Sequence, residues 1–159
     1  MIQKIKPFLW FDKEAEEAAN FYCSIFKNSK VLNVARYPEG GPAPAGSVMI
    51  VTFQLEGLEF TALNAGPMFK FTEAISFAVS TENQEETDYF WNKLTADGGK
   101  ESDCGWLKDK FGLSWQITPR ALIELMSSSD KQKSARVMAA MMTMKKINIA
   151  ELERAAAQS

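Results

Sequence analysis

The chain has 159 residues, two cysteines, no histidine and a formal charge of −2 at pH 7. This length fits one domain or two half-domains that share a core, and the lack of histidine excludes Ser-His-Asp and Cys-His catalysis and zinc sites with histidine ligands. A pI near 5.3 excludes a general binder of phosphate backbones, so we expect no nucleic acid partner.

The first 11 residues, MIQKIKPFLWF, are too short and too charged to span a bilayer or to serve as a secretory signal. We therefore expect no membrane association. With two cysteines and no secretory segment, the chain is expected in a reduced, cytoplasmic setting.

The N-terminal part of the chain predicts a strand, a helix and three further strands. Apolar and aromatic residues fill positions 5–11, and Asp12 stands where a helix N-cap belongs. The helix places five residues on one face: Ala15, Ala18, Ala19, Tyr22 and Phe26. Strands follow at 31–37, 47–55 and 59–65, the first two separated by a loop rich in proline and glycine.

The second part repeats this order. A strand over 74–80 precedes a helix over 81–99, capped by Thr81 or Asn83 and closed at Gly98, and the stretch CGWLKDKFGLSWQITPR supplies a strand, a tight turn and a last strand. Aligning Phe77 with Phe8 also aligns a pair of glutamates in each helix. We therefore predict a duplicated βαβββ unit.

After Thr118 the pattern becomes helical. We expect Thr118 to cap a short helix with Pro119 in its first turn, a second helix to begin at Ser129 or Asp130, and a third at Asn148. The second helix and the residues after it place Val137, Met141 and Met144 on one side. The predicted fold class is α+β: repeats at 1–72 and 73–119 form a curved mixed sheet around a cavity, and 120–159 is an all-α extension.

The turn at Asp109 to Gly112 resembles the Asp-x-x-Gly turn of the vicinal oxygen chelate superfamily, which includes glyoxalases, bleomycin-resistance proteins and extradiol dioxygenases. Tandem βαβββ units are typical of that superfamily. Within it, the stretches AEEAANFY, GGPAPAGSVMIVTF, FTALNAGPMFKFTEA and MMTMKKINIAELERA look like the PhnB-like subgroup, often labelled demethylubiquinone methyltransferase.

The resemblance implies where metal ligands would stand: at the first and last strand of each repeat. Those places hold Lys6 or Pro7, Thr61, Glu73 or Ala74, and Gln116, where metal-binding members carry a glutamate. A divalent cation prefers several anionic or imidazole ligands, so this set predicts a degenerate metal site. We expect no cofactor; at most Glu73 and Gln116 hold a hard ion weakly.

Several residues are candidates for a ligand pocket. If Trp115 and Ile117 face the covering helices, Gln116 and Ser114 face the concave side of the sheet, where Gln116 either contacts a ligand or pairs with backbone. The aromatic side chains that could line the pocket, or instead belong to the core or to a dimer interface, are Trp10, Phe69, Trp106 and Trp115.

Two polar residues either belong to the site or serve only the structure of their own loop or turn. Asn64 is either a ligand donor or part of the turn before Ala-Gly-Pro. Glu73 is the candidate general base, with a solvated loop carboxylate as the alternative.

Three functions are compatible with these features. The leading hypothesis is a glyoxalase-like homodimer that binds a small molecule without a functional metal. The second is an enzyme, a lyase, isomerase or transferase that acts on a small oxygen-bearing metabolite, with methyl transfer disfavoured because no Gly-rich turn leads from a strand into a helix. The third is sequestration without turnover. The sequence leaves open whether the repeats pair within one chain or across a dimer.

Overall fold

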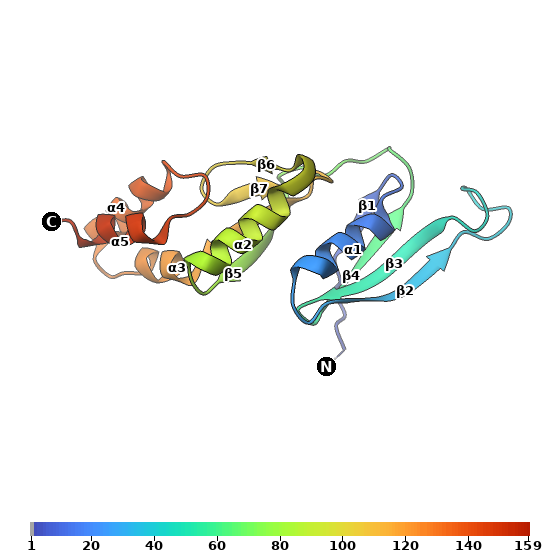
Figure 1. Ribbon diagram of the computed structural model, residues 1–159, viewed down its shortest axis with the longest axis horizontal. Coiled ribbons are helices and arrows are strands. Elements are labelled where there is room, and N and C mark those ends of the chain that lie inside the picture. Colours follow the sequence, from blue (N-terminus) through green and yellow to red (C-terminus); the bar gives the residue numbers. More distant parts are fainter. Residues whose placement is uncertain (1) are drawn as a thin grey trace. The chain divides into compact units, whose positions relative to one another are not determined.

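The computed structural model describes residues 2–159, which form two compact units that divide between Phe71 and Thr72 (Figure 1). Each unit contains a four-stranded mixed sheet with a helix on it, and the second unit also carries the C-terminal helices. The predicted α+β class, with two βαβββ modules and a helical extension, is confirmed. No helix among the described residues is long and apolar enough to cross a membrane.

The N-terminal unit has one helix and four strands. Their bounds are β1 (Phe8–Phe11), α1 (Ala15–Ile25), β2 (Lys30–Arg36), β3 (Val48–Leu55) and β4 (Leu58–Asn64). The sheet order is β1-β4-β3-β2, with β1 parallel to β4 and the other pairs antiparallel.

The C-terminal unit repeats the order of strands. Its module consists of β5 (Phe77–Thr81), α2 (Gln84–Thr95), the 3₁₀ turn η1 (Ala96–Gly98), β6 (Lys100–Glu101), β7 (Trp106–Lys108) and β8 (Ser114–Pro119). The sheet order is β5-β8-β7-β6, again with the first strand parallel to the last. The extension follows as α3 (Arg120–Met126), α4 (Lys131–Met141) and α5 (Ile149–Ala157).

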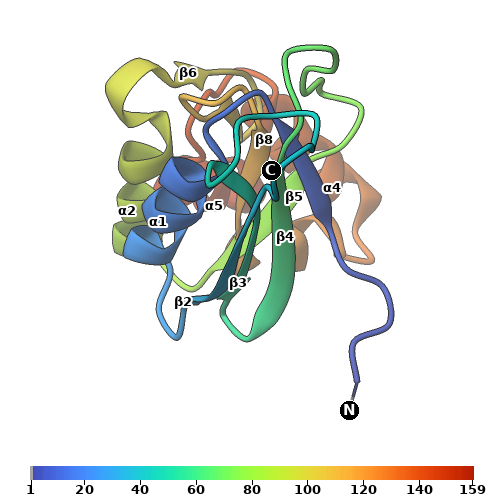
Figure 2. The same ribbon diagram turned by 90° about the vertical axis from the view of Figure 1, so that its right-hand side faces the viewer.

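Helix α1 covers one face of the N-terminal sheet (Figure 2). All five residues of its predicted apolar face are buried, and Tyr22 stacks on Phe53 of β3 with ring centroids 6.2 Å apart. The predicted N-cap at Asp12 is wrong, because the helix begins at Ala15 with Glu14 at the N-cap position. The backbone N–H of Ala15 donates instead to Oδ1 of Asn64, at 2.8 Å.

The other predicted caps depend on local side chains. Asn83, Asp130 and Asn148 each accept a backbone N–H from the first turn of their helices, as the sequence predicts. The expectation for Thr118 is wrong: Thr118 still belongs to β8, where it pairs with Ser80, and Pro119 takes the N-cap position of α3.

The helical extension is built into the C-terminal unit. Its core consists of Leu122, Val137, Met144, Ile147 and Leu152. Two backbone N–H groups before β7, those of Cys104 and Gly105, donate to the carbonyl oxygens of Met144 and Lys145 at 2.8 and 2.7 Å.

Gln84 makes a second connection to the extension from the start of α2. Its amide donates to the carbonyl of Ile147 at 3.0 Å and accepts from the N–H of Ile149 at 2.8 Å. Polar bonds from two separate parts of the module therefore hold the segment between α4 and α5.

Gly105 is required at this junction. It has a φ of +85°, and a Cβ added there would lie 3.0 Å from the carbonyl oxygen of Ile117 and 3.2 Å from Cγ1 of Ile147. We predict that Gly105→Ala lowers the free energy of unfolding by about 1–3 kcal/mol, measured by chemical denaturation. Gly112→Ala is the matched control, since Gly112 has a φ of +87° with no atom within 4 Å. An equal loss in both variants would show that backbone strain alone is responsible.

Candidate functional site

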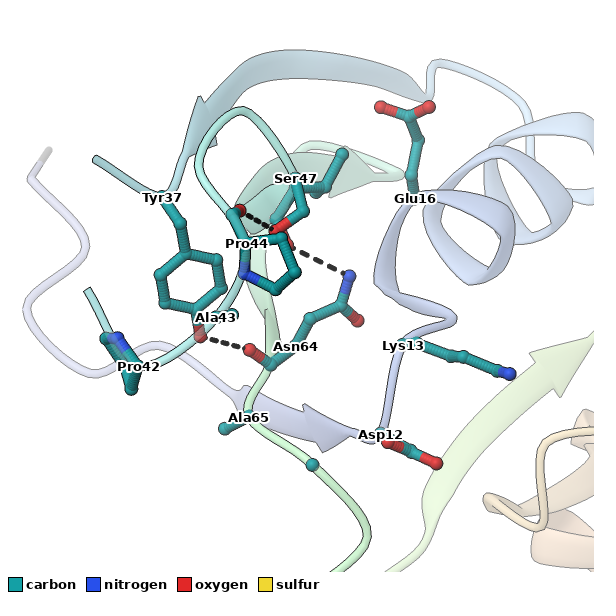
Figure 3. Close-up of a pocket in the computed structure, with 12 residues that line it drawn as sticks. Asp12, Lys13, Glu16, Tyr37, Pro42, Ala43, Pro44, Ser47, Asn64 and Ala65 are labelled. Atoms are coloured by element: carbon teal, nitrogen blue, oxygen red, sulfur yellow. Dashed lines mark hydrogen bonds between the residues drawn. The ribbon is translucent and has the colours of Figure 1, made fainter. Parts of the chain in front are cut away.

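A pocket of about 550 Å³ lies in the N-terminal unit, at the end of the sheet where β1 and β4 terminate (Figure 3). Its lining comes from the start of α1, the ends of β1, β2 and β4, and the loop that joins β2 to β3. The lining residues are Asp12, Lys13, Glu16, Tyr37, Pro42, Ala43, Pro44, Ser47, Val48, Asn64, Ala65 and Gly66.

The polar groups in the wall of this pocket bond to the protein itself. The hydroxyl of Tyr37, a residue only 8% exposed, donates to the backbone oxygen of Asn64. The side chain of Asn64 accepts from Ala15 N–H and donates to the carbonyl of Val48 at 3.2 Å. Asn64 was a candidate ligand donor, but its amide is used to join α1, β3 and β4.

The remaining polar lining of this pocket is charged. Asp12, Lys13 and Glu16 stand at the start of α1, and among residues 2–159 their charged groups form no ion pair. They leave two carboxylates and one ammonium available at the mouth of a pocket whose walls are otherwise satisfied.

The C-terminal sheet has one face that carries α2 and a second face that does not, which we call the open face. Trp115 and Ile117 of β8 are buried on the side that carries α2. In the antiparallel pair β7–β8, Lys108 lies opposite Ser114 and Trp106 lies opposite Gln116. Residues directly opposite in an antiparallel pair share a face, so these four side chains form the open face, as the alternation of β8 predicted for Ser114 and Gln116.

Gln116 is partly engaged on this face. Its amide nitrogen donates to Oγ of Ser76 at 2.9 Å, which leaves its carbonyl oxygen as an acceptor. The sequence left open whether Gln116 bonds to a ligand or to the backbone. Within this unit its partner is the side chain of Ser76.

A second pocket, of about 220 Å³, lies along β6, β7 and β8 in the C-terminal unit. It is lined by Glu73, Lys100, Glu101, Ser102, Trp106, Leu107, Lys108 and Ser114. Glu101 accepts the indole N–H of Trp91 at 2.8 Å. Ser114 is 1% exposed, and its hydroxyl has no hydrogen-bond partner.

Glu73 forms an ion pair with Lys108 at the edge of this pocket. The hydrogen bond from the Lys108 ammonium is the main cause that lowers the pKa of the Glu73 carboxyl below its ordinary value. A carboxylate held in this way takes up a proton less readily, which makes Glu73 a weaker base than an unpaired glutamate.

The other aromatic candidates do not share one pocket. In the N-terminal unit, Trp10 donates its indole N–H to the carbonyl of Gly66 at 2.8 Å and packs edge-on against Phe69, with ring centroids 4.8 Å apart. In the C-terminal unit, Trp106 lines the 220 Å³ pocket, whereas Trp115 is buried on the opposite face with its indole N–H donating to Asp109 at 2.9 Å.

The positions at which the resemblance implies metal ligands offer few donors. Of the alternatives Lys6 and Pro7, the lysine forms an ion pair with Glu59 and the proline has no side-chain donor, while Thr61 is a neutral hydroxyl on β4. Of the alternatives Glu73 and Ala74, the carboxylate is paired with Lys108 and the alanine has no donor group. Gln116 has only its amide oxygen left. Among residues 2–159 no three acidic, cysteine or histidine side chains gather closely enough to hold an ion. This donor set does not fit a divalent cation.

The sequence reasoning did not anticipate the roles of Ser114, Lys108 and Tyr37. Alternation placed Ser114 on the concave side, but nothing in the sequence signals that its hydroxyl lacks a partner. The Lys108–Glu73 pair joins a loop to a strand 35 positions later in the numbering, so no local pattern shows it. For the N-terminal pocket, the one feature visible in the sequence is the proline-rich loop after Tyr37, whose residues line the pocket.

Known proteins share both the sequence pattern and the fold. A sequence model of the 3-demethylubiquinone-9 3-methyltransferase family matches residues 3–118. A PhnB protein from Bacillus cereus is 40% identical over 74% of this chain and 99% of its own, with a TM-score of 0.67. Among curated proteins there is no significant match.

More distant structures share the fold alone. Protein PA1353 from Pseudomonas aeruginosa is 18% identical over 74% of this chain and 98% of its own, with a TM-score of 0.62. The fosfomycin resistance protein FosX from Listeria monocytogenes is 15% identical over 75% of this chain and 94% of its own, with a TM-score of 0.51.

The two βαβββ modules therefore define a protein of the vicinal oxygen chelate fold. Within that fold class, the chain belongs to the PhnB-like 3-demethylubiquinone-9 3-methyltransferase family. The matched segment ends at residue 118, so helices α3, α4 and α5 lie beyond it.

The multiple bonds of Asn64 predict its effect on stability. Asn64→Ala should lower the free energy of unfolding by about 1–3 kcal/mol, because it leaves the N–H of Ala15 and the carbonyl of Val48 without partners. Chemical denaturation measures the change. Asn33→Ala, at an exposed position of β2, is the control and should stay close to the parent protein. Equal stability of the two variants would contradict the role given to Asn64.

The Glu73–Lys108 pair predicts a pH dependence. Since the pKa of Glu73 is lowered in the folded protein, the pair stabilises the fold above the ordinary glutamate pKa, and this stabilisation is lost as the pH falls through the lowered value. Glu73→Gln should therefore melt at a lower temperature than the parent at pH 7, by a small amount, and the difference should shrink as the pH falls through the lowered pKa of Glu73. A difference that does not shrink as the solution is acidified would contradict the pairing.

Proposed function

We propose that this protein binds a compact organic molecule on the open face of the C-terminal sheet, without a metal ion. The observation that carries the proposal is the 220 Å³ pocket beside β7 and β8, where Trp106 offers an aromatic surface next to Lys108 and Ser114. Binding pockets typically combine apolar walls with a few polar groups that orient the ligand.

Proteins that share the fold support a role with small molecules. The FosX protein, which shares the fold, is described as a fosfomycin resistance protein, and a variant of it has been solved with Mn(II) and 1S,2S-dihydroxypropylphosphonic acid. In the present chain, the positions at which the resemblance implies metal ligands hold a lysine or a proline, a threonine, a glutamate or an alanine, and a glutamine, and both the lysine and the glutamate are paired. We therefore propose that protein groups alone orient the ligand here.

Methyl transfer, which the family description names, has less support in this chain. The loop with Gly40, Gly41 and Gly46 joins strands β2 and β3. In a doubly wound fold that binds a nucleotide-like cofactor, a glycine-rich turn leads instead into a helix N-terminus.

The alternative of an enzyme with Glu73 as base stays a prediction. It requires Glu73→Gln to abolish turnover while sparing binding.

The assembly and location of the protein also stay predictions. The resemblance implies a homodimer, which light scattering coupled to size-exclusion chromatography measures directly. A cytoplasmic location is expected from the two cysteines together with the lysines and proline that interrupt the first apolar stretch.

The test is a fragment screen by protein-observed NMR, carried out in excess EDTA and repeated with Mn(II), Ni(II) or Zn(II) added. We expect fragments that perturb the Trp106 indole and the Gln116 side-chain amide, with dissociation constants unchanged by the metals. Trp106→Ala should weaken these fragments about tenfold through loss of aromatic contact. The matched control is Trp10→Ala in the N-terminal unit, which should leave them unaffected.

Two results would overturn the proposal. One is binding that occurs only with an added divalent ion, which would restore metal-dependent chemistry. The other is a complete screen in which no fragment perturbs the open face.

A further inference from the structure

One buried polar group in the C-terminal unit has no partner. Among residues 2–159, the hydroxyl of Ser114 is the one buried side-chain nitrogen or oxygen atom without a hydrogen bond. A buried hydroxyl loses its bonds to water on folding, and most proteins replace them with internal ones. Ser114 therefore retains an unused donor and acceptor in the wall of the 220 Å³ pocket.

The residue directly opposite Ser114 carries a positive charge. Lys108 lies across the β7–β8 ladder from Ser114, on the same face and in the same pocket. A second lysine, Lys100, lines the pocket and forms no ion pair among the described residues. A hydroxyl beside ammonium groups is a site for an anionic oxygen, because both groups can donate to it.

The protein already places a carboxylate at Lys108. Glu73, from the loop before β5, forms the ion pair, and its side chain is 63% exposed whereas that of Lys108 is 35% exposed. The carboxylate thus approaches from the solvent side and can leave without disturbing the core. Exposed ion pairs are weak, so a bound ligand can replace Glu73 at little cost.

The other acid in the pocket does not compete for this position. Glu101 accepts the indole N–H of Trp91, which directs its carboxylate toward α2. When Glu73 moves away, the pocket therefore presents two ammonium groups and a free hydroxyl against a single engaged carboxylate.

We infer that the pocket binds the carboxylate group of a small organic acid, which displaces Glu73 from Lys108 and accepts a hydrogen bond from Ser114. Glu73 then acts as an internal competitor that occupies the anion position until the ligand arrives. Trp106, two residues before Lys108 on the same face, provides an apolar wall for the rest of the molecule. The inference rests on the proposed function, since it names the ligand class of the same pocket.

The experiment measures the dissociation constants of benzoate and of uncharged benzamide by isothermal titration calorimetry at low salt. The pair differs in charge but hardly in shape. In Glu73→Gln, benzoate should bind about three- to tenfold tighter than in the parent, because the competing carboxylate is gone, while benzamide should be unchanged. In Lys108→Met, benzoate should bind at least tenfold more weakly than in Glu73→Gln.

An ion pair elsewhere in the same unit supplies the matched control. Asp103 pairs with Lys145 at 3.3 Å, outside the lining of the pocket. Asp103→Asn removes one negative charge, as Glu73→Gln does, and should leave benzoate binding at the parent value. Tighter benzoate binding in both variants would show that net charge alone is responsible, and would overturn the inference.

Ser114→Ala separates a ligand role from a structural one. Benzoate should bind about tenfold more weakly to this variant, through loss of a bond to a charged group, while the melting temperature should be equal or higher because the hydroxyl has no partner in the free protein. A lower melting temperature with unchanged benzoate binding would overturn the role of Ser114.

Two further results decide between the inference and the proposed function. If benzamide and benzoate bind equally well in every variant, the anion site is disproved while small-molecule binding stands. If benzoate fails to bind to Glu73→Gln, the inference is disproved whatever the fragment screen finds.

Discussion

The buried carboxylate of Asp109 determines the geometry of the C-terminal sheet. Asp109 is 2% exposed and accepts the N–H groups of Phe111 and Leu113 through Oδ1, at 2.8 and 3.1 Å, and the indole N–H of Trp115 through Oδ2, at 2.9 Å. The same side chain thus shapes the tight turn and fixes the largest side chain of β8 in the core. Three hydrogen bonds to one buried carboxylate hold the Asp109 side chain in a single orientation. The register of β7 on β8, which sets Lys108 against Ser114, follows from that turn.

The pattern that resembles the superfamily motif therefore has a structural meaning in this chain. Asp109 and Gly112 build the turn, whereas Gln116, which follows on β8, bonds to Ser76. The residue at position 116 can therefore change without disturbing the turn, because the turn depends on the carboxylate of Asp109. Scaffold and chemistry are separable here, so family members can keep the fold while their sites change.

Helix caps show how far the sequence could predict the fold. Asn83, Asp130 and Asn148 cap the helices that follow them, a local relation that is visible in the sequence. At α1 the bond to Ala15 comes from Asn64, 49 positions away, so inspection of Asp12 and its neighbours could not find it. In the site, strand alternation located Ser114 and Gln116 correctly on one face. The pairing of Glu73 with Lys108 depends on the path of a loop, which residue patterns do not specify.

The junction between the module and its helical extension has a further consequence. Its two contacts at Cys104 and Gly105 run from backbone N–H to backbone carbonyl, so they impose a chain path on the segment at Met144 and Lys145 but no particular side chains there. The side chains of the extension are constrained instead by its own core, which includes Met144 and Ile147. Yet a chain cut back to the length of the family match would leave those N–H groups unpaired. Deletion of the extension would therefore cost two backbone hydrogen bonds at the junction, whatever side chains stand at the two carbonyl groups.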